Sequence, residues 1–189
     1  MENILFDFLS KYISLNEDEK QALIALDIFR SVKKGTILLR EGESSQMGYF
    51  VLNGCLRTFY IINGEEKTTA FHTEMDSIMP SCVLSKKPSE YSISCVEDSV
   101  ITVSNPDMEE EKFPKFEKLC RVLSEVLLVK QQIDFDKFKT STPEGRYQNL
   151  QENRPDLIQR IPQHQLASFI GITPQSLSRM KSRILDKTK

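Results

Sequence analysis

IPQHQLASFIGITPQSLSRMKSRI, residues 161–184, is the stretch that decides the fold. Its first half predicts a short helix with three apolar residues on its buried face: Leu166, Ala167 and Ile170. Gly171 follows at the position where helices commonly end with a positive φ. Thr173 can then cap a second helix, with Pro174 at its first position. Two short helices joined by a glycine corner indicate a helix-turn-helix.

The second helix has the two faces that a DNA-reading helix needs. Leu177, Met180 and Ile184 recur at helical spacing and are expected to face inward. On the polar side, Gln175 can bond adenine and Arg179 can bond guanine. Lys181 and Arg183 suit phosphate contacts. The predicted DNA-binding residues are Thr173, Gln175, Ser176, Ser178, Arg179, Lys181 and Arg183. An ordinary helical hairpin with a solvated face is the alternative.

Charge is distributed unevenly along the chain, although the formal net charge is only −2. Residues 140–189 carry eight basic and four acidic side chains, a net charge of +4, which leaves −6 on residues 1–139. A polyanion is therefore expected to bind at the C-terminal end.

The middle of the chain reads as a β domain. Segments rich in β-branched and aromatic residues predict strands at 36–39, 49–52, 56–62, 67–71, 91–96 and 99–103. Asn-Gly pairs at 53–54 and 63–64 favour the positive φ of type I′ hairpin turns. Short strands joined by tight turns indicate an antiparallel barrel or sandwich.

Helices are expected on both sides of this β domain. Residues 6–29 are predicted to be helical, with Asn16 as a cap before an acidic first turn. After the β domain, a long helix has a coiled-coil-like seam with Lys130 in it. The apolar seam residues are Phe116, Leu119, Leu123, Val126 and Ile133. Further apolar residues beside the seam predict a dimerisation helix, the alternative being burial in its own core. Thr142 and Pro143 then begin another helix.

Several classes of protein are disfavoured. Hydrophobic residues make up 39% and charged residues 28%, typical of a globular domain. We expect a cytoplasmic protein with no membrane contact, because no apolar run approaches the roughly 20 residues of a membrane span and no signal peptide is evident.

Cysteine and histidine spacing argues against a metal site. The four cysteines contain no C-x-x-C pair, and there are only two histidines. Cys55, Cys82, Cys95 and Cys120 are therefore read as reduced core residues. No Gly-x-Ser-x-Gly, Walker or zinc signature is present, so we predict no enzyme.

The segments 142–147 (TPEGRY) and 161–179 together resemble the Crp/Fnr superfamily of bacterial regulators, in particular the branch common in Bacteroidetes. Gly35 and the segments 41–43, 49–51 and 53–54 match its early β-roll signature, so the resemblance covers nearly the whole chain. It implies a homodimer through the central helix, with two recognition helices on a two-fold operator. Such regulators recruit or block RNA polymerase, which makes polymerase a candidate partner. By resemblance, Gln175, Ser176 and Arg179 fall at base-contacting positions.

The resemblance also locates an effector pocket. Superfamily members that bind cyclic AMP carry a Gly-Glu pair and an arginine between the later strands. Residues 76–92 contain no Gly-Glu pair, and Ser89 or Glu90 stands where the arginine belongs. A carboxylate there would repel a phosphate, so we expect no bound cyclic nucleotide and predict no cofactor. The alternatives left open are an empty pocket and a different small effector. The candidate pocket residues are Ser81, Cys82, Ser89, Glu90 and Tyr91. The iron–sulfur branch's N-terminal cysteine cluster is absent, and His72 alone is weak support for haem.

Together these observations predict an α+β fold in three parts. Residues 1–112 form an antiparallel β-roll sensor domain with N-terminal helices, 113–139 the central dimerisation helix, and 140–189 a winged helix-turn-helix. The predicted function is sequence-specific DNA binding by a homodimeric transcription regulator. The alternative is a ligand-binding sensor module whose C-terminal helices serve protein–protein contacts.

Overall fold

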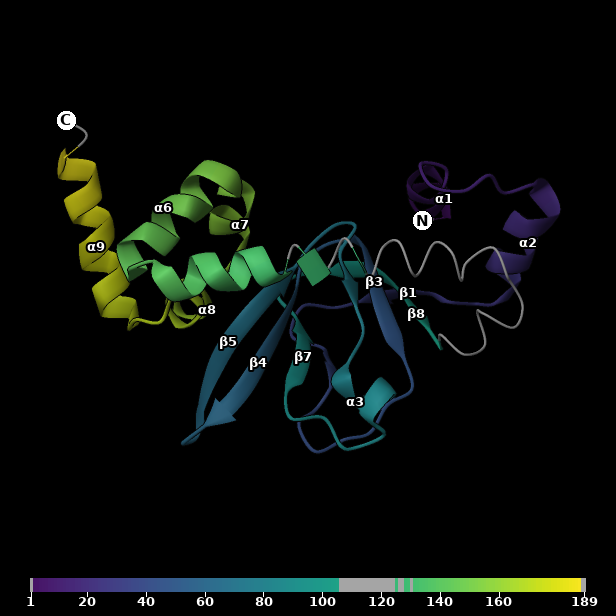
Figure 1. Cartoon of the computed structure of the whole chain (residues 1–189), viewed down its shortest axis with the longest axis horizontal. Coiled ribbons are helices and arrows are strands. Elements are labelled where there is room, and N and C mark those ends of the chain that lie inside the picture. Colours follow the sequence, from purple (N-terminus) through teal and green to yellow (C-terminus); the bar gives the residue numbers. More distant parts are fainter. Residues whose placement is uncertain (1, 106–124, 126–127, 130, 188–189) are drawn as a thin grey trace.

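Three groups of elements follow one another along the long axis of the molecule (Figure 1). The computed structural model describes residues 2–105, 125, 128–129 and 131–187. Two N-terminal helices lie at one end, an antiparallel β domain in the middle, and helices α6–α9 at the other end. The predicted α+β order is confirmed. No helix in the described part of the chain is long and apolar enough to cross a bilayer.

The β domain consists of two four-stranded antiparallel sheets. The first has the order β1 (Phe29–Val32), β8 (Ser99–Ser104), β3 (Gly48–Asn53) and β6 (Ser77–Ile78). The second has the order β2 (Ile37–Leu39), β7 (Ser92–Cys95), β4 (Leu56–Ile62) and β5 (Glu65–His72). A short helix, α3 (Ser81–Ser85), connects β6 to β7.

The core of this domain lies between the sheets. Val51 and Ile101 from the first sheet, and Leu56 and Ile93 from the second, are completely buried in one cluster. Side chains alternate across a strand, so β3 and β7 each contribute every second residue to this cluster: Tyr49 and Val51 from β3, Ile93 and Cys95 from β7. Burying each such side chain stabilises the fold by about 1.5–3 kcal/mol.

Of the two Asn-Gly pairs, only the second forms the predicted hairpin. Asn63 and Gly64 have φ of +53° and +79°, as a type I′ turn between β4 and β5 requires. The hairpin prediction for Asn53-Gly54 is wrong. Of that pair only Gly54 has a positive φ, and the chain crosses there from β3 in one sheet to β4 in the other.

The N-terminal segment forms two helices instead of the single one predicted from residue 6 to residue 29. They are α1 (Glu2–Leu9) and α2 (Glu17–Ala25). A capping box starts α2: the Asn16 side chain accepts from the Glu19 N–H at 2.8 Å, and the Asn16 N–H donates to the Glu19 carboxylate at 2.9 Å. The helix ends before Phe29, because Phe29 pairs with Thr102 in β1.

Within the described range 131–187, five segments are helical. Residues 131–140 are helical. They are followed by α6 (Pro143–Asn153), α7 (Pro155–Arg160), α8 (Gln163–Ile170) and α9 (Pro174–Lys187). The Thr142 hydroxyl accepts from the Gly145 N–H at 3.1 Å, which confirms the predicted start of α6. Within 131–187 there is no strand to form the predicted wing, because the linkers between α6 and α9 are one to three residues long.

The predicted dimer seam falls mostly outside the described residues. Phe116, Leu119, Leu123 and Val126 lie there, so their packing stays a prediction. Ile133 is described, and its side chain is 48% exposed. The predicted domain boundaries also stay predictions.

Candidate nucleic-acid interface

The corner between α8 and α9 is formed by backbone hydrogen bonds around one glycine. The Gly171 N–H donates to the carbonyls of Ala167 and Ser168 at 3.0 and 3.1 Å, and the Ile172 N–H donates to Ala167 at 3.0 Å. Gly171 has φ +86°, a conformation that strains any residue with a Cβ. The predicted glycine corner is confirmed.

Thr173 caps the second helix, as predicted. Its Oγ1 accepts a hydrogen bond from the Ser176 N–H at 3.2 Å, and Pro174 is the first helical residue. Since proline lacks an N–H, its own position in the first turn has no backbone donor that needs a partner.

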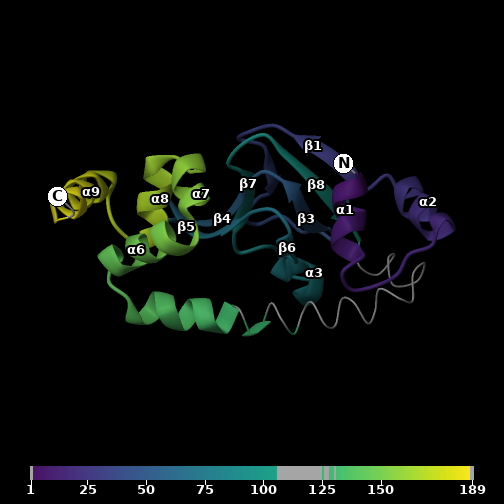
Figure 2. The same cartoon turned by 90° about the horizontal axis from the view of Figure 1, so that it is seen from above.

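The two faces of α9 differ as the sequence predicts. Leu177 and Met180 are 0% and 4% exposed, and Ile184 is half-buried. Five predicted contact residues are exposed: Thr173, Gln175, Ser176, Ser178 and Arg179. Figures 1 and 2 place α9 at the outer end of the molecule, on the far side of the other C-terminal helices from the β domain. Its polar face is therefore accessible to a large partner.

The two flanking cations are placed differently from each other. Lys181 is half-buried, and its Nζ donates to the Gln163 Oε1 at 2.7 Å, at the start of α8. Burial lowers the pKa of Lys181. The Arg183 side chain is 68% exposed and lies 3.6 Å from the Glu144 carboxylate. Arg183 thus faces solvent, whereas Lys181 braces α9 against α8.

A compact apolar core holds the two helices together. Leu166, Ala167, Ile170 and Leu177 are all 0% exposed, and they pack with four further buried residues of α6–α9: Tyr147, Leu157, Ile161 and Met180. The predicted buried face of α8 is confirmed. Such a core keeps the exposed face of α9 in one orientation, which a groove-reading helix requires.

Arg146 on α6 links the helix-turn-helix to helix 131–140. Its Nε and Nη2 donate to the Phe138 carbonyl at 3.2 and 2.9 Å, and its Nη1 donates to the Ile170 carbonyl at 2.9 Å. The guanidinium also lies 3.7 Å from the centroid of the Phe138 ring. One side chain thus caps the ends of two helices, which positions the α8–α9 corner relative to helix 131–140.

The candidate effector residues are partly brought together. The Ser81 N–H donates to the Tyr91 hydroxyl at 3.1 Å, and the Ser89 hydroxyl donates to the Tyr91 carbonyl at 2.7 Å. Cys82 and Ser89 are buried. Glu90 is exposed, so its carboxylate is not enclosed with the others.

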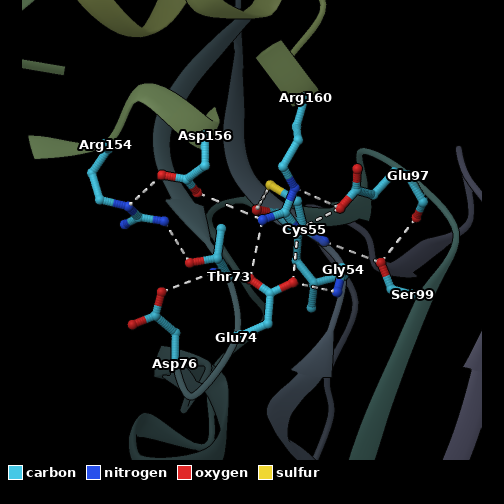
Figure 3. Close-up of polar contacts among 11 residues, drawn as sticks. Gly54, Cys55, Thr73, Glu74, Asp76, Glu97, Ser99, Arg154, Asp156 and Arg160 are labelled. Carbon is cyan, nitrogen blue, oxygen red and sulfur yellow. Dashed lines mark hydrogen bonds and ion pairs between the residues drawn. The ribbon is translucent and has the colours of Figure 1, made fainter. Parts of the chain in front are cut away.

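Sequence reasoning missed two further functional candidates, Arg154 and Arg160. Both reach from the C-terminal helices to the β domain (Figure 3). The two β-domain carboxylates that contact Arg160 are 63 and 86 residues away in the chain. No local pattern indicates a contact over that separation. The only available signal was the presence of two arginines at the ends of a six-residue helix.

Comparisons with known proteins agree with this architecture. Residues 29–109 match the family model of the cyclic nucleotide-binding domain. TTHB099 of Thermus thermophilus, a transcriptional regulator of the CRP family, has a TM-score of 0.68 and 13% identity, over 84% of this chain and 85% of that chain. FixK2 of Bradyrhizobium japonicum has a TM-score of 0.66 and 15% identity, over 85% of each chain.

A third solved structure covers slightly more of the chain. CLP, a c-di-GMP-responsive global regulator of Xanthomonas campestris, has a TM-score of 0.66 and 12% identity, over 89% of this chain and 93% of that chain. No curated protein matches the sequence. Residues 29–109 are therefore similar to a cyclic nucleotide-binding domain, and the chain shares the fold of these solved regulators. The Bacteroidetes branch stays a prediction.

Proposed function

We propose that this chain is a sequence-specific DNA-binding transcription regulator of Crp/Fnr type that acts as a cytoplasmic homodimer. One observation carries the proposal: α9 presents an exposed polar face while its other face is fixed in the helix-turn-helix core. The exposed side chains on that face are short, polar or basic, and such side chains suit contacts with base edges and phosphates.

The side chains on that face suit the major groove. Gln175 and Arg179 are one helical turn apart and therefore lie on the same side of α9. Their amide and guanidinium groups match the edges of adenine and guanine. Arg183 extends the face by another turn and suits a phosphate. The net charge of +4 on residues 140–189 attracts DNA to this end of the molecule.

A second copy of the chain would pair along the central helix. Helix 131–140 is exposed along its length, and several apolar side chains on the helical residues stand in solvent in the single chain: Leu128, Val129, Ile133, Phe135 and Phe138. Covering such a surface stabilises association. A dimer would place two α9 helices on a two-fold operator.

The β domain serves as the effector domain in this proposal, without cyclic AMP. Arginine is the side chain that pairs with a cyclic phosphate through two parallel charge-assisted hydrogen bonds. The pocket segment instead has Ser89, whose hydroxyl donates to the Tyr91 carbonyl, and the exposed Glu90. The proposal assigns no cofactor, and it leaves RNA polymerase as the further partner of a DNA-bound dimer.

Selection from a random 40-base-pair duplex library with the full chain tests the DNA-binding proposal. We expect enrichment of a two-fold sequence, with an affinity that falls steeply as salt rises, because bound phosphates release counterions. If no sequence is enriched at physiological salt, the proposal is wrong. That result would favour a ligand-binding module whose C-terminal helices contact proteins.

Arg179→Ala tests the base-contacting role on the enriched duplex. We expect a loss of about 1–3 kcal/mol and relaxed preference at one base pair in each half-site. Arg40→Ala is the matched control, because it removes the same charge from an exposed position of the β domain. Equal effects of the two substitutions would contradict the assignment of α9 as the reading helix.

A further inference from the structure

The C-terminal end of α7 meets the β domain through a single guanidinium. Arg160 Nη2 and Nη1 donate to the Glu74 carboxylate at 2.8 and 3.1 Å. Its Nε and Nη2 donate to Glu97 Oε1 at 3.0 and 2.5 Å. Figure 3 shows this guanidinium between the two carboxylates, which come from different turns of the β domain. One side chain of the helix-turn-helix end thus holds two β turns.

The contact between Arg160 and the two glutamates is partly shielded from water and is supported by a further hydrogen bond. The side chains of Arg160, Glu74 and Glu97 are only 23%, 35% and 30% exposed. Glu74 also accepts from the Gly54 N–H at 2.9 Å. Hydrogen bonds to Glu74 and Glu97 raise the pKa of Arg160. Partly desolvated, charge-assisted bonds of this kind are stronger than exposed ion pairs.

A second arginine contacts the same region of the β domain. Arg154 Nη2 donates to the Thr73 hydroxyl at 2.7 Å, and its Nε lies 3.5 Å from the Asp156 carboxylate. Asp156 in turn lies 3.6 Å from Arg160. The ends of α7 are therefore joined to each other and to the turn between β5 and β6.

Behind the guanidinium, the two parts of the molecule share one apolar core. Cys55 and Val96 of the β domain are buried in the same cluster as Tyr147, Leu157 and Ile161 of the C-terminal helices. Cys55 is 0% exposed, and burial raises the pKa of its thiol to about 12. Cys55 is therefore protected as long as the two parts stay in contact.

The contact extends to α8, the first helix of the helix-turn-helix. The Ser168 hydroxyl accepts from the Thr68 N–H at 3.0 Å and donates to the Glu66 carbonyl at 3.1 Å, on strand β5. The rings of Phe71 and Phe169 lie 5.3 Å apart. Strand β5 thus contacts α8 directly, and the two acidic turns contact α7 through Arg160.

The two glutamates that bind Arg160 flank the candidate pocket segment in the sequence. Glu74 lies just before β6 (Ser77–Ile78), and Glu97 lies just after β7 (Ser92–Cys95). All five candidate effector residues fall between these two carboxylates in sequence. Arg160 therefore binds the residues that flank both ends of the segment that contains the candidate pocket.

We infer that Arg160 is a positioning residue that couples the pocket segment, residues 77–95, to the orientation of the helix-turn-helix. This inference rests on the proposed DNA-binding function. A shift of β6 or β7 changes the spacing of Glu74 and Glu97, and Arg160 transmits that change to α7 and thereby to α8 and α9. Two reading helices bind a two-fold operator tightly only when their orientation is set beforehand.

Three full-length variants test the coupling: Arg160→Gln, Glu97→Gln and the double variant. We expect each single substitution to raise the alkylation rate of Cys55 by about 10-fold or more, because the shared core opens more often. We expect the affinity for the enriched duplex to fall by about 10-fold. The double variant should add little to either effect, because both substitutions break the same contact.

The chain supplies its own controls. Cys95 lies in the core between the two sheets, so its alkylation, resolved by peptide mass spectrometry, should not change in a folded variant. Arg179→Ala should weaken DNA binding and leave Cys55 protected. Hydrogen exchange across residues 77–91 should rise in Arg160→Gln and stay unchanged in Arg179→Ala. If Arg160 acted only on the C-terminal helices, exchange in this segment would not rise.

The outcomes separate the inference from the proposed function. If Cys55 stays protected, or DNA affinity is unchanged or higher in Arg160→Gln and Glu97→Gln, the coupling is overturned while DNA binding by the wild-type chain stands. If the wild type enriches no duplex, the proposed function is overturned, and the Cys55 and exchange results alone decide whether Arg160 couples the two parts. If Arg160→Gln exposes Cys95 as well, it has unfolded, and Glu97→Gln decides the result.

Discussion

Gly54 sits where β3 passes to β4, next to Cys55, which packs against the C-terminal helices. Its φ is +109°, and a Cβ at this position would lie 2.6 and 2.7 Å from the Cβ and Cα of Ser99. Ser99 has little room to move, because its hydroxyl accepts from the Cys55 N–H and donates to the Glu97 carbonyl. Both conformation and space therefore require glycine.

Gly54→Ala should lower the free energy of unfolding by at least about 2 kcal/mol, since positive-φ strain and a backbone clash act together. Chemical denaturation measures this change. Gly64→Ala is the matched control: its φ is +79° but no atom lies within 4 Å of the added Cβ, so only about 1 kcal/mol should be lost. Equal losses would show that the contact with Ser99 relaxes without cost.

At the scale of elements, the geometry of the helix-turn-helix depends on how helices end. Gly171 ends α8, Thr173 starts α9, and Arg146 caps both α8 and helix 131–140 from the side. The first two are local and were predictable. The third joins residues 8 and 24 positions apart, and it needs the planar, five-donor guanidinium.

Arg146→Lys should destabilise the chain by about 1–3 kcal/mol, because one ammonium cannot reach both the Phe138 and Ile170 carbonyls in the same fork geometry. Hydrogen exchange should rise at the ends of both helices. Arg183→Lys should change stability by less than about 0.5 kcal/mol, since that side chain is 68% exposed. An Arg146→Lys variant as stable as the wild type would show that either cation suffices.

For the whole molecule, we consider two surfaces where parts assemble. One is formed by the two acidic turns of the β domain, whose Glu74 and Glu97 bind Arg160 within the chain. The other is the exposed apolar side of the central helix, which we propose is covered by a second copy. Each gives a prediction that concerns assembly of parts and not the stability of one element.

Ile133→Glu should weaken the dimer by about 10-fold or more, because a charge would be buried at the proposed seam. Analytical ultracentrifugation at a series of concentrations measures the effect. Gln132→Glu adds the same charge one position away on the helix and should leave the dimer intact. A wild-type chain that remains monomeric at high micromolar concentration would contradict the dimer.

The Glu74 contact predicts a pH dependence. Burial raises the pKa of Glu74, but hydrogen bonds from Arg160 and from backbone N–H groups outweigh it, so the pKa lies below its ordinary value. Such a carboxyl adds stability above its unfolded pKa and loses it as the pH falls through its folded pKa. Between about pH 5 and pH 3, the free energy of unfolding should therefore fall more steeply for wild type than for Glu74→Gln. Parallel pH profiles would show that this carboxylate adds no pH-dependent stability.

Local patterns in the sequence determined the elements that depend on neighbouring residues. The glycine corner at Gly171, the caps at Asn16, Thr142 and Thr173, and the hairpin at Asn63-Gly64 all follow from short-range hydrogen bonds and φ preferences. The buried and exposed faces of α9 follow from helical spacing. These interactions span a few residues, so the order of residue types is sufficient to predict them.

Only the tertiary structure decided which distant residues meet. In the folded chain, Asn53-Gly54 is a crossing between sheets, and Lys181 bonds to Gln163. Arg160 pairs with Glu74 and Glu97. Ion pairs between residues 63 and 86 positions apart depend on how the sheets stack and where the helices dock. No periodicity in one chain records that geometry, because a charged side chain has the same local pattern whether it faces water or a partner.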